Sequence, residues 1–334
     1  MSDFRSARYR SLFWPLVLIG VGVVWLLVNL GVLSATSLGL LLNLWPLLLV
    51  GIGLDLIFGR RSPMVGALIG FLMVAAVVAL LLLAPSLNLA SATVPQTRQL
   101  TVALQDTTSA NVELNLSSYS NSIYALPDSS PNLLDGVVHY TGTIDFSAQG
   151  SGGVMDVRLS HSGMFGWWFS PNLSGNDTQW KIGLSPKVPL TLHINPASGS
   201  SDIDLSGLKL ASLSVDAASG STNLRLPVSS QPYTVDYQGA SGSADISLPA
   251  NTSLTMHLHG ASGSLNVNLP ASAAVHIDIR DSGSGSINVP GSLNRLNGSG
   301  RDKTGTWESQ GFATAEMKVT IIVDDAGSGS INID

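Results

Sequence analysis

The chain has 334 residues, no cysteine, 34 glycines and a charged fraction of only 11%. The lack of Cys excludes a disulfide framework, a thiolate metal site and thiol catalysis. Residues 1–85 carry five basic and two acidic side chains, whereas residues 86–334 carry 11 basic and 20 acidic ones, a net charge of −9. Nucleic acid is therefore not an expected partner, because phosphate-backbone binding needs clustered Lys and Arg.

The first 85 residues contain three apolar runs, Leu12–Leu33, Leu38–Phe58 and Gly66–Leu83. Each run is long enough to cross a hydrocarbon core of about 30 Å as a helix. Basic residues precede the first run and follow the second, whereas the segment between these two runs has none. The positive-inside rule then predicts three spans, a cytoplasmic N-terminus and an extracytoplasmic C-terminal part. The lipid bilayer is an expected partner.

Residues 86–97 are small, polar and proline-containing, which is typical of a linker. Beyond the linker, apolar and polar residues alternate with a period of two, the pattern of half-buried strands. We therefore divide the chain into a transmembrane region (1–85), a linker (86–97) and an all-β domain (98–334). The clearest alternating segments are Gln99–Leu104, Asn111–Leu116, Val137–Phe146, Val154–Leu159 and Leu190–Ile194.

A Ser-Gly-Ser triplet recurs through the all-β part, starting at residues 198, 219, 241, 262, 284 and 328. Successive gaps are 21, 22, 21, 22 and 44 residues, and the last is twice the usual spacing. A fixed period of this size is the signature of stacked repeats. The sequence predicts a single-stranded β-solenoid (β-helix) with 21–22-residue coils, each stacked on the coil before it. A sandwich of hairpins is the alternative fold.

Two columns of residues follow the triplets. The third residue after each triplet is aliphatic, and the residue before it is Asp or Asn, so that the aliphatic side chain should point inward and the polar one outward. We expect the polar residues to hydrogen-bond along a ladder. We expect Gly to form the corners because it tolerates positive φ. The aliphatic column consists of Ile203, Leu224, Ile246, Val267, Val289 and Ile333.

Two stretches carry a family resemblance. The apolar N-terminal pattern, with Asn29-Leu30-Gly31 ending the first run and Leu44–Pro46 opening the second, resembles the LiaI/LiaF-like transmembrane region. The stretch Trp180–Pro227 resembles the β-helical toastrack domain of LiaF-like proteins. The resemblance implies a bacterial multi-pass membrane protein of the cell-envelope stress response. The best-known members restrain a membrane sensor kinase.

Catalytic motifs are lacking in the sequence, and we expect neither an enzyme nor a cofactor. The repeated Ser-Gly lacks the strand–turn–helix context of a nucleophile elbow. His257 and His259 share one strand face, and Asp278 follows one repeat later. With coils in register, Asp236, His257 and Asp278 would form one exposed column. A divalent metal could bind there, but we favour a surface ladder of opposite charges and predict no metal site.

One aromatic segment interrupts the repeat. Phe165, Trp167, Trp168 and Phe169 lie close together in a chain that is only 6% aromatic, and Trp180 follows. Such a cluster could contact a partner, a glycan or the lipid interface. It could equally cap the solenoid, since solenoid ends need covering. We name these four residues, Phe165 to Phe169, as the candidate contact surface.

The favoured function is non-enzymatic. The protein would bind or regulate an envelope-sensing signalling system through its external solenoid, with a sensor kinase or another envelope protein as partner. The alternative is an adhesin-like or self-associating surface module. In that case a coil ending in Ile331–Ile333 would expose a strand edge, and the chain would form a homo-oligomer.

Overall fold

The computed structural model describes residues 12–30, 44–58, 63–83, 96–116, 120–140, 142–162, 179–260, 262–298 and 303–334. The chain divides into a helical unit, which contains the residues up to Pro95, and a β-rich unit that begins at Gln96. The candidate contact surface Phe165, Trp167, Trp168 and Phe169 lies outside the described residues.

The helical unit contains α1 (Phe13–Asn29), α3 (Trp45–Phe58) and α4 (Pro63–Leu83). They lie in the three predicted apolar runs. Among the described helices, only Met64–Leu83 of α4 is long and apolar enough to cross a membrane by itself. Helices α1 and α3 are also apolar but shorter, so the three predicted spans are matched by one helix of full length and two shorter ones.

Close packing joins these helices. A side chain at Gly20 of α1 would collide with Val74 of α4, so the missing side chain lets the two backbones approach. Large apolar side chains cover the outside of the unit, with Leu18, Trp25 and Phe71 each more than 60% exposed. A helix that is apolar all round suits lipid. Asp55 is nevertheless buried between the helices, 8% exposed.

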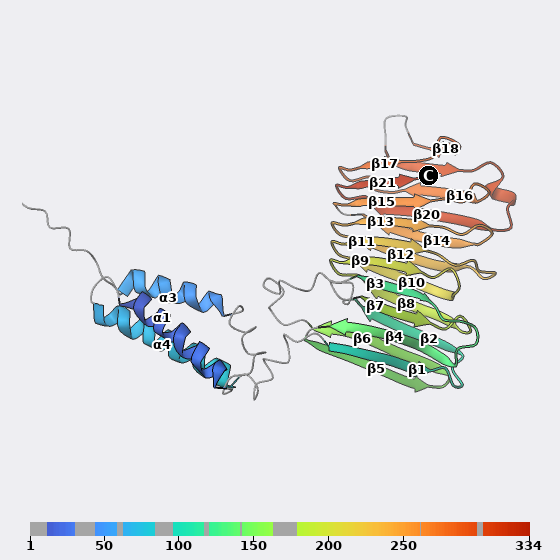
Figure 1. Cartoon of the computed structure of the whole chain (residues 1–334). Coiled ribbons are helices and arrows are strands. Elements are labelled where there is room, and N and C mark those ends of the chain that lie inside the picture. Colours follow the sequence, from blue (N-terminus) through green and yellow to red (C-terminus); the bar gives the residue numbers. More distant parts are fainter. Residues whose placement is uncertain are drawn as a thin grey trace, which may run out of the picture. The chain divides into compact units, whose positions relative to one another are not determined.

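The β-rich unit consists of two sheets, A and B, whose strands alternate along most of the chain (Figure 1). Sheet A contains, in spatial order, β1 (Gln96–Ala103), β4 (Asn132–Tyr140), β7 (Trp180–Leu184), β3 (Asn121–Ala125), β9 (Ser200–Asp204), β11 (Ser221–Arg225), β13 (Ser243–Ser247), β15 (Ser264–Asn268), β21 (Ser330–Ile333) and β17 (Ser286–Asn288). Sheet B contains β18 (Asn294–Asn297), β19 (Gly305–Glu308), β16 (Ala274–Ile279), β20 (Lys318–Asp325), β14 (Leu254–His259), β12 (Tyr233–Gly239), β10 (Lys209–Ala217), β8 (Pro189–Asn195), β2 (Ser109–Asn115), β6 (Val154–Ser162) and β5 (Thr143–Ser151).

Each coil contributes one strand to each sheet and pairs in parallel with the coils above and below. Leu224 lies beside Ile203 on one side and Ile246 on the other, and Ile246 lies beside Val267. These side chains are fully buried in the core between the sheets. The predicted aliphatic column is therefore confirmed for these coils. The predicted strand Val137–Phe146 is wrong, because a turn with Gly142 at φ 98° divides it between β4 and β5.

The order of the coils departs from the order of the sequence. The C-terminal coil, β20–β21, lies between β14–β15 and β16–β17 and pairs in parallel with both. The N-terminal coil, β2–β3, lies in the same way between β6–β7 and β8–β9. Sequential stacking is thus wrong at both ends. The expected exposed edge at Ile331–Ile333 is also wrong, because β21 has a partner on each side.

Antiparallel strands cover parts of both ends of the stack. At one end β1 and β4 pair antiparallel with each other, and β4 pairs antiparallel with β7. At the other end β19 pairs antiparallel with both β16 and β18. Such end strands shield the core residues of the last coils from water.

The Ser-Gly-Ser corners are built by close backbone contact. A methyl group added to Gly242 would collide with the carbonyl oxygen of Gly220, and one added to Gly263 would collide with that of Gly242. None of these three glycines has φ in the positive region. The expectation that the triplet glycine supplies positive φ is therefore wrong. Glycine is needed because a Cβ has no room between stacked corners.

Candidate interaction surfaces

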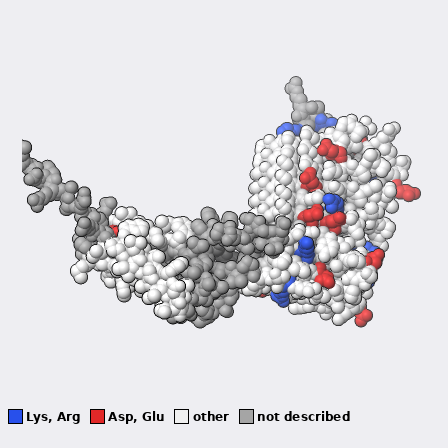
Figure 2. All heavy atoms as spheres, viewed as in Figure 1, with Lys and Arg blue, Asp and Glu red and all other residues white. Residues whose placement is uncertain are grey.

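The outer face of sheet A carries a ladder of Asp and Asn side chains, one from each of six stacked coils. The side-chain amide of an Asn donates each hydrogen bond of the ladder to the next coil. These bonds run from Asn223 to Asp202 (3.1 Å), from Asn266 to Asp245 (2.8 Å), from Asn332 to Asn266 (3.0 Å) and from Asn288 to Asn332 (2.7 Å). Figure 2 shows charged side chains in a narrow row across the stacked coils, beside an uncharged strip. The predicted polar ladder is confirmed, and its side chains are bonded mainly to one another.

The outer face of sheet B carries four histidines that each lie near an acid, a set we call the histidine–acid row. Its pairs are His193–Asp216 (3.5 Å), His259–Asp236 (3.8 Å), His257–Asp324 (2.7 Å) and His276–Glu308 (2.8 Å). The side chains are partly exposed, so each isolated pair contributes little to stability. The row instead places histidine and acid side chains side by side on neighbouring strands of this face.

Asp324 is the centre of the row. It comes from β20 of the inserted C-terminal coil and contacts His257 of β14 at 2.7 Å and Arg280, just after β16, at 2.6 Å. Burial raises the pKa of the Asp324 carboxyl, but hydrogen bonds from His257 and Arg280 outweigh it, so the pKa lies below its ordinary value. The side chain therefore links the inserted coil to both of its neighbours.

A groove of about 420 Å³ lies on the same face, near β5. Its walls come from β2, β5, β6 and β8. Arg158 pairs with Glu113 at 2.6 Å, and Asn111 donates to Asp156 at 2.7 Å. Burial raises the pKa of Glu113, but hydrogen bonds from Asn115 and Arg158 outweigh this effect, so the pKa lies below its ordinary value. The groove is polar, and its charged groups are already paired.

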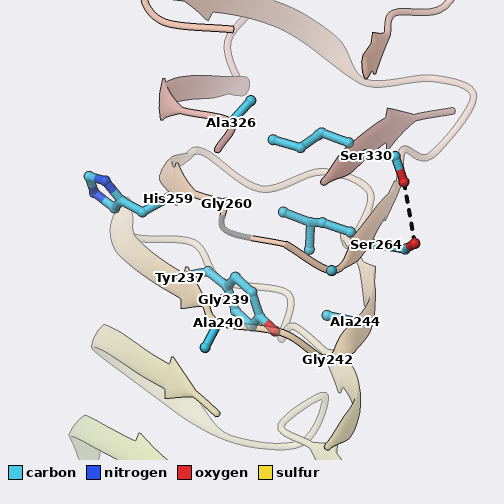
Figure 3. A pocket seen from close by; sticks show the side chains of 13 residues that line it. Tyr237, Gly239, Ala240, Gly242, Ala244, His259, Gly260, Ser264, Ala326 and Ser330 are labelled. Carbon is cyan, nitrogen blue, oxygen red and sulfur yellow. Dashed lines mark hydrogen bonds between the residues drawn. The ribbon is translucent and has the colours of Figure 1, made fainter. Parts of the chain in front are cut away.

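A second hollow lies inside the Gly-Ser corner (Figure 3). Its volume of about 20 Å³ is enough for about one water molecule and no larger ligand. In Figure 3 the Tyr237 ring lies beside Ala240 and Ala244, whereas the His259 ring points away. Burial raises the pKa of Tyr237 to about 12, although a hydrogen bond with Thr222 opposes the shift. This hollow is a packing feature of the corner.

The expected column of Asp236, His257 and Asp278 is formed only in part, because Asp236 lies beside His257 but Asp278 does not. Strand β20 separates β14 from β16, so Ile322 lies beside both His257 and Asp278. Within the part of the chain that the structure describes, no group of three or more His, Cys, Asp or Glu side chains could hold a metal ion. Sequence reasoning missed Asp324 as a member of the row and Arg280 as its partner, because their neighbours depend on where the C-terminal coil inserts.

The aromatic segment is described only at its C-terminal end. Trp180 is fully buried, and its indole N–H donates to the carbonyl of His139 at 2.8 Å. The His161 ring packs edge-on against it, with the ring centroids 5.9 Å apart. Trp180 is thus a core residue of the first coils. The contact role of the four residues from Phe165 to Phe169 stays a prediction.

Two family models match the chain. The LiaF transmembrane domain matches residues 13–102, and the N-terminal domain of toast_rack matches residues 91–247. The matches define a protein with a membrane region followed by a toastrack domain. The chain is therefore LiaF-like in its domain order, as the resemblance of both stretches predicted. No curated protein matches the chain.

Solved structures similar to the chain come from several bacteria. A candidate cell adhesion protein from Clostridium sporogenes is 18% identical, with a TM-score of 0.48, covering 72% of this chain and 99% of its own. A candidate adhesin from Bacteroides fragilis is 12% identical, with a TM-score of 0.24 and coverages of 72% and 97%. A candidate lipid binding protein from Parabacteroides distasonis is 14% identical, with a TM-score of 0.22 and coverages of 72% and 96%.

Proposed function

We propose that the protein acts by binding in a signalling system that responds to stress at the bacterial cell envelope. A LiaF-type transmembrane domain leading directly into a toastrack domain carries this proposal. The expected partner is a membrane sensor kinase or another envelope protein. The toastrack domain would supply the contact surface outside the membrane, and the helical unit would hold it at the bilayer.

Binding rather than catalysis is supported by the way the outer faces are built. On sheet A the ladder amides bond to one another, and on sheet B the acids pair with His or Arg. An enzyme would instead direct several such groups toward one reacting atom. Rigid, regularly spaced polar faces suit recognition of another surface.

The finer features of the proposal are a multi-pass topology and coils of 21–22 residues. Three apolar helices and the basic residues near the first two runs support three spans with residues after about 86 outside the cytoplasm. The lateral pairing of Leu224 with Ile203 and Ile246 supports the coil length. An external solenoid would present its polar faces to the cell envelope.

The absence of Cys from the sequence gives a direct test of topology. Single variants Ser62→Cys and Thr97→Cys would be exposed in intact cells to a maleimide that does not cross membranes. We expect labelling of Thr97→Cys only, and labelling of both after the cells are opened. Equal labelling of both variants in intact cells would refute the three-span topology.

Partner binding needs a separate measurement. The full-length chain and a version ending at Pro95 would each be purified from membranes, with a sensor histidine kinase as the expected co-purifying protein. We expect the kinase to co-purify with the full-length chain and not with the version that ends at Pro95. Recovery of the kinase in equal amounts with both versions would show that the toastrack domain is not the contact.

A further inference from the structure

Asn297 and Gly298 form the only Asn-Gly pair in the sequence. Asn297 is the last residue of β18, and Figure 1 shows β18 near β17 at one end of the stack. Both residues of the pair are exposed, and Gly298 has φ 102°, which a residue with a side chain rarely adopts. Without a Cβ on Gly298, the Asn297 side chain can approach the peptide nitrogen that follows it.

The Asn297 side chain is folded back onto this nitrogen. The Gly298 N–H donates to the Asn297 Oδ1 at 2.7 Å. Since Oδ1 is bonded to Cγ, the nitrogen also lies near the side-chain carbonyl carbon, and a rotation about the Cβ–Cγ bond turns the face of the amide toward it. Holding two reacting groups close together removes much of the entropy cost of the reaction between them. The local geometry thus favours closure of a cyclic imide, a succinimide.

Arg295 contacts the same peptide group. Its Nε donates to the Asn297 carbonyl at 3.0 Å, and its Nη2 donates to the Thr304 carbonyl at 2.8 Å. The guanidinium also lies over the Trp307 ring, 4.9 Å from the ring centre, and is thus held in place. When the Gly298 nitrogen loses its proton, the negative charge spreads onto the Asn297 carbonyl oxygen. A charged donor at that oxygen stabilises the deprotonated peptide, which is the nucleophile.

We propose that Asn297 and Gly298 are a site of self-modification, at which Asn297 becomes aspartate and isoaspartate through a succinimide. The Gly298 nitrogen gives its proton to water and bonds to the Asn297 Cγ. The bond from Cγ to Nδ2 then breaks, and the nitrogen takes up a proton from water and leaves as ammonia. Water next opens the ring at either carbonyl carbon. Opening at Cγ gives aspartate, opening at the main-chain carbon gives isoaspartate, and nothing is oxidised or reduced.

The two products change this end of the solenoid in different ways. Aspartate adds a negative charge two residues from Arg295 on the same strand. Isoaspartate lengthens the main chain at the position that pairs with Thr306 of β19, so it disturbs the pairing of β18 with β19. Loss of ammonia makes the change irreversible, and the modified fraction therefore rises with the age of the molecule. The site is independent of the signalling role proposed above, because the reaction needs no partner protein.

Peptide mapping by mass spectrometry tests the reaction. The purified full-length protein would be kept for several days in mildly alkaline buffer made with water enriched in heavy oxygen, and samples would be digested at intervals. We expect aspartate and isoaspartate peptides, separated by chromatography, each with heavy oxygen at residue 297. Asn294 is exposed on the same strand but is followed by Arg295, so it is the internal control and should stay an amide. Asn297→Gln should stay unmodified, because Gln would have to close a larger ring.

Arg295→Lys tests the part played by the guanidinium. Lys keeps the positive charge and the apolar stem near Trp307 but has no donor at the Nε position. Loss of this hydrogen bond should slow the modification of Asn297 by about 3- to 10-fold. Thermal melts would verify that the variant folds. A synthetic peptide of residues 292–300 is the matched control, because it does not hold the guanidinium against the Asn297 carbonyl, and the same replacement should leave its rate nearly unchanged.

Three results would overturn the proposal. The first is modification of Asn297 that is no greater than modification of Asn294. The second is aspartate without isoaspartate, which would indicate direct hydrolysis of the side-chain amide instead of ring closure. The third is an equal rate for the wild type and Arg295→Lys in the folded protein, which would mean that the contact of Arg295 with the Asn297 carbonyl does not promote the reaction.

Discussion

Replacing Gly242 by Ala should destabilise the β-rich unit strongly for so small a change. The new methyl group would collide with the carbonyl oxygen of Gly220 in the neighbouring coil. That oxygen accepts a hydrogen bond from the Ser243 N–H at 3.2 Å, and the Gly242 carbonyl accepts one from Ser264 at 3.2 Å. Moving the Gly242 corner away from Gly220 would stretch the first of these bonds and displace the acceptor of the second.

The size of the effect follows from these contacts. Overpacking costs about 1–3 kcal/mol, and weakening two backbone hydrogen bonds costs about 0.5–1.5 kcal/mol each. The total is roughly 2–6 kcal/mol, which corresponds to a drop in melting temperature of about 4–24 °C for a domain of this size. The small hollow in the corner does not relieve the collision, because the methyl group points at the backbone.

The assay is a thermal melt of the full-length protein in detergent, followed by the far-ultraviolet circular dichroism of the sheets. Gly291→Ala is the matched control, because a methyl group there meets nothing within 4 Å and φ lies outside the positive region. We expect it to melt within ~2 °C of the wild type. If Gly242→Ala has the same melting temperature as Gly291→Ala, the close-contact explanation of the repeated glycine is refuted.

Other substitutions test the inner column and the histidine–acid row. Ile246→Asp buries a charge between Leu224 and Val267 and should lower the free energy of unfolding by at least ~3 kcal/mol. Asp245→Asn, on the outer face, should leave it nearly unchanged. Equal losses for the two variants in thermal melts would contradict the assignment of Ile246 to the inside and Asp245 to the outside. Asp324→Asn should lower the free energy of unfolding by about 1–3 kcal/mol at pH 7, because it weakens the hydrogen bonds to His257 and Arg280. The folded-state pKa of Asp324 is lowered, so its stabilisation is present above the ordinary carboxyl pKa of about 3.9 and disappears as the pH falls through the lower folded value. Denaturant melts should thus show the difference between the two proteins shrinking as the pH falls below about 4, and a difference that does not shrink there would contradict this account.

Because of the repeat, the sequence was sufficient to predict both the polar ladder and the buried column of the β-rich unit. Because an Asp or Asn and an aliphatic residue recur at fixed places after each triplet, the ladder and the buried column could both be predicted. Ile246 and Asp245 have the environments that their positions in the pattern require. The role of Gly242 could not be found this way, since a glycine needed for close packing and one needed for positive φ look the same in sequence.

The order of the coils was beyond the reach of the sequence pattern. The C-terminal triplet lies 44 residues after the one before it, a spacing that fits either addition to the end of the stack or insertion inside it. The coils carry the same pattern of aliphatic and Asp or Asn residues, so the sequence of one coil is compatible with stacking on several others. The partners of Asp324 depend on this choice, and the histidine–acid row could therefore be predicted only in part.

The insertion of the C-terminal coil has a consequence for biosynthesis. Residues of β16–β19 leave the ribosome before β20–β21, yet they find their stacking partner only when the final strands arrive. The carbonyl of Asp334, just after β21, accepts a hydrogen bond from the Leu269 N–H, and the Asp334 N–H donates to the carbonyl of Val267. Folding of this end must therefore wait until β20 and β21 have been synthesised. A chain that stops before β20 would leave β16 and β17 without their parallel neighbours and open to proteases, so this end of the solenoid is complete only when the inserted coil is in place.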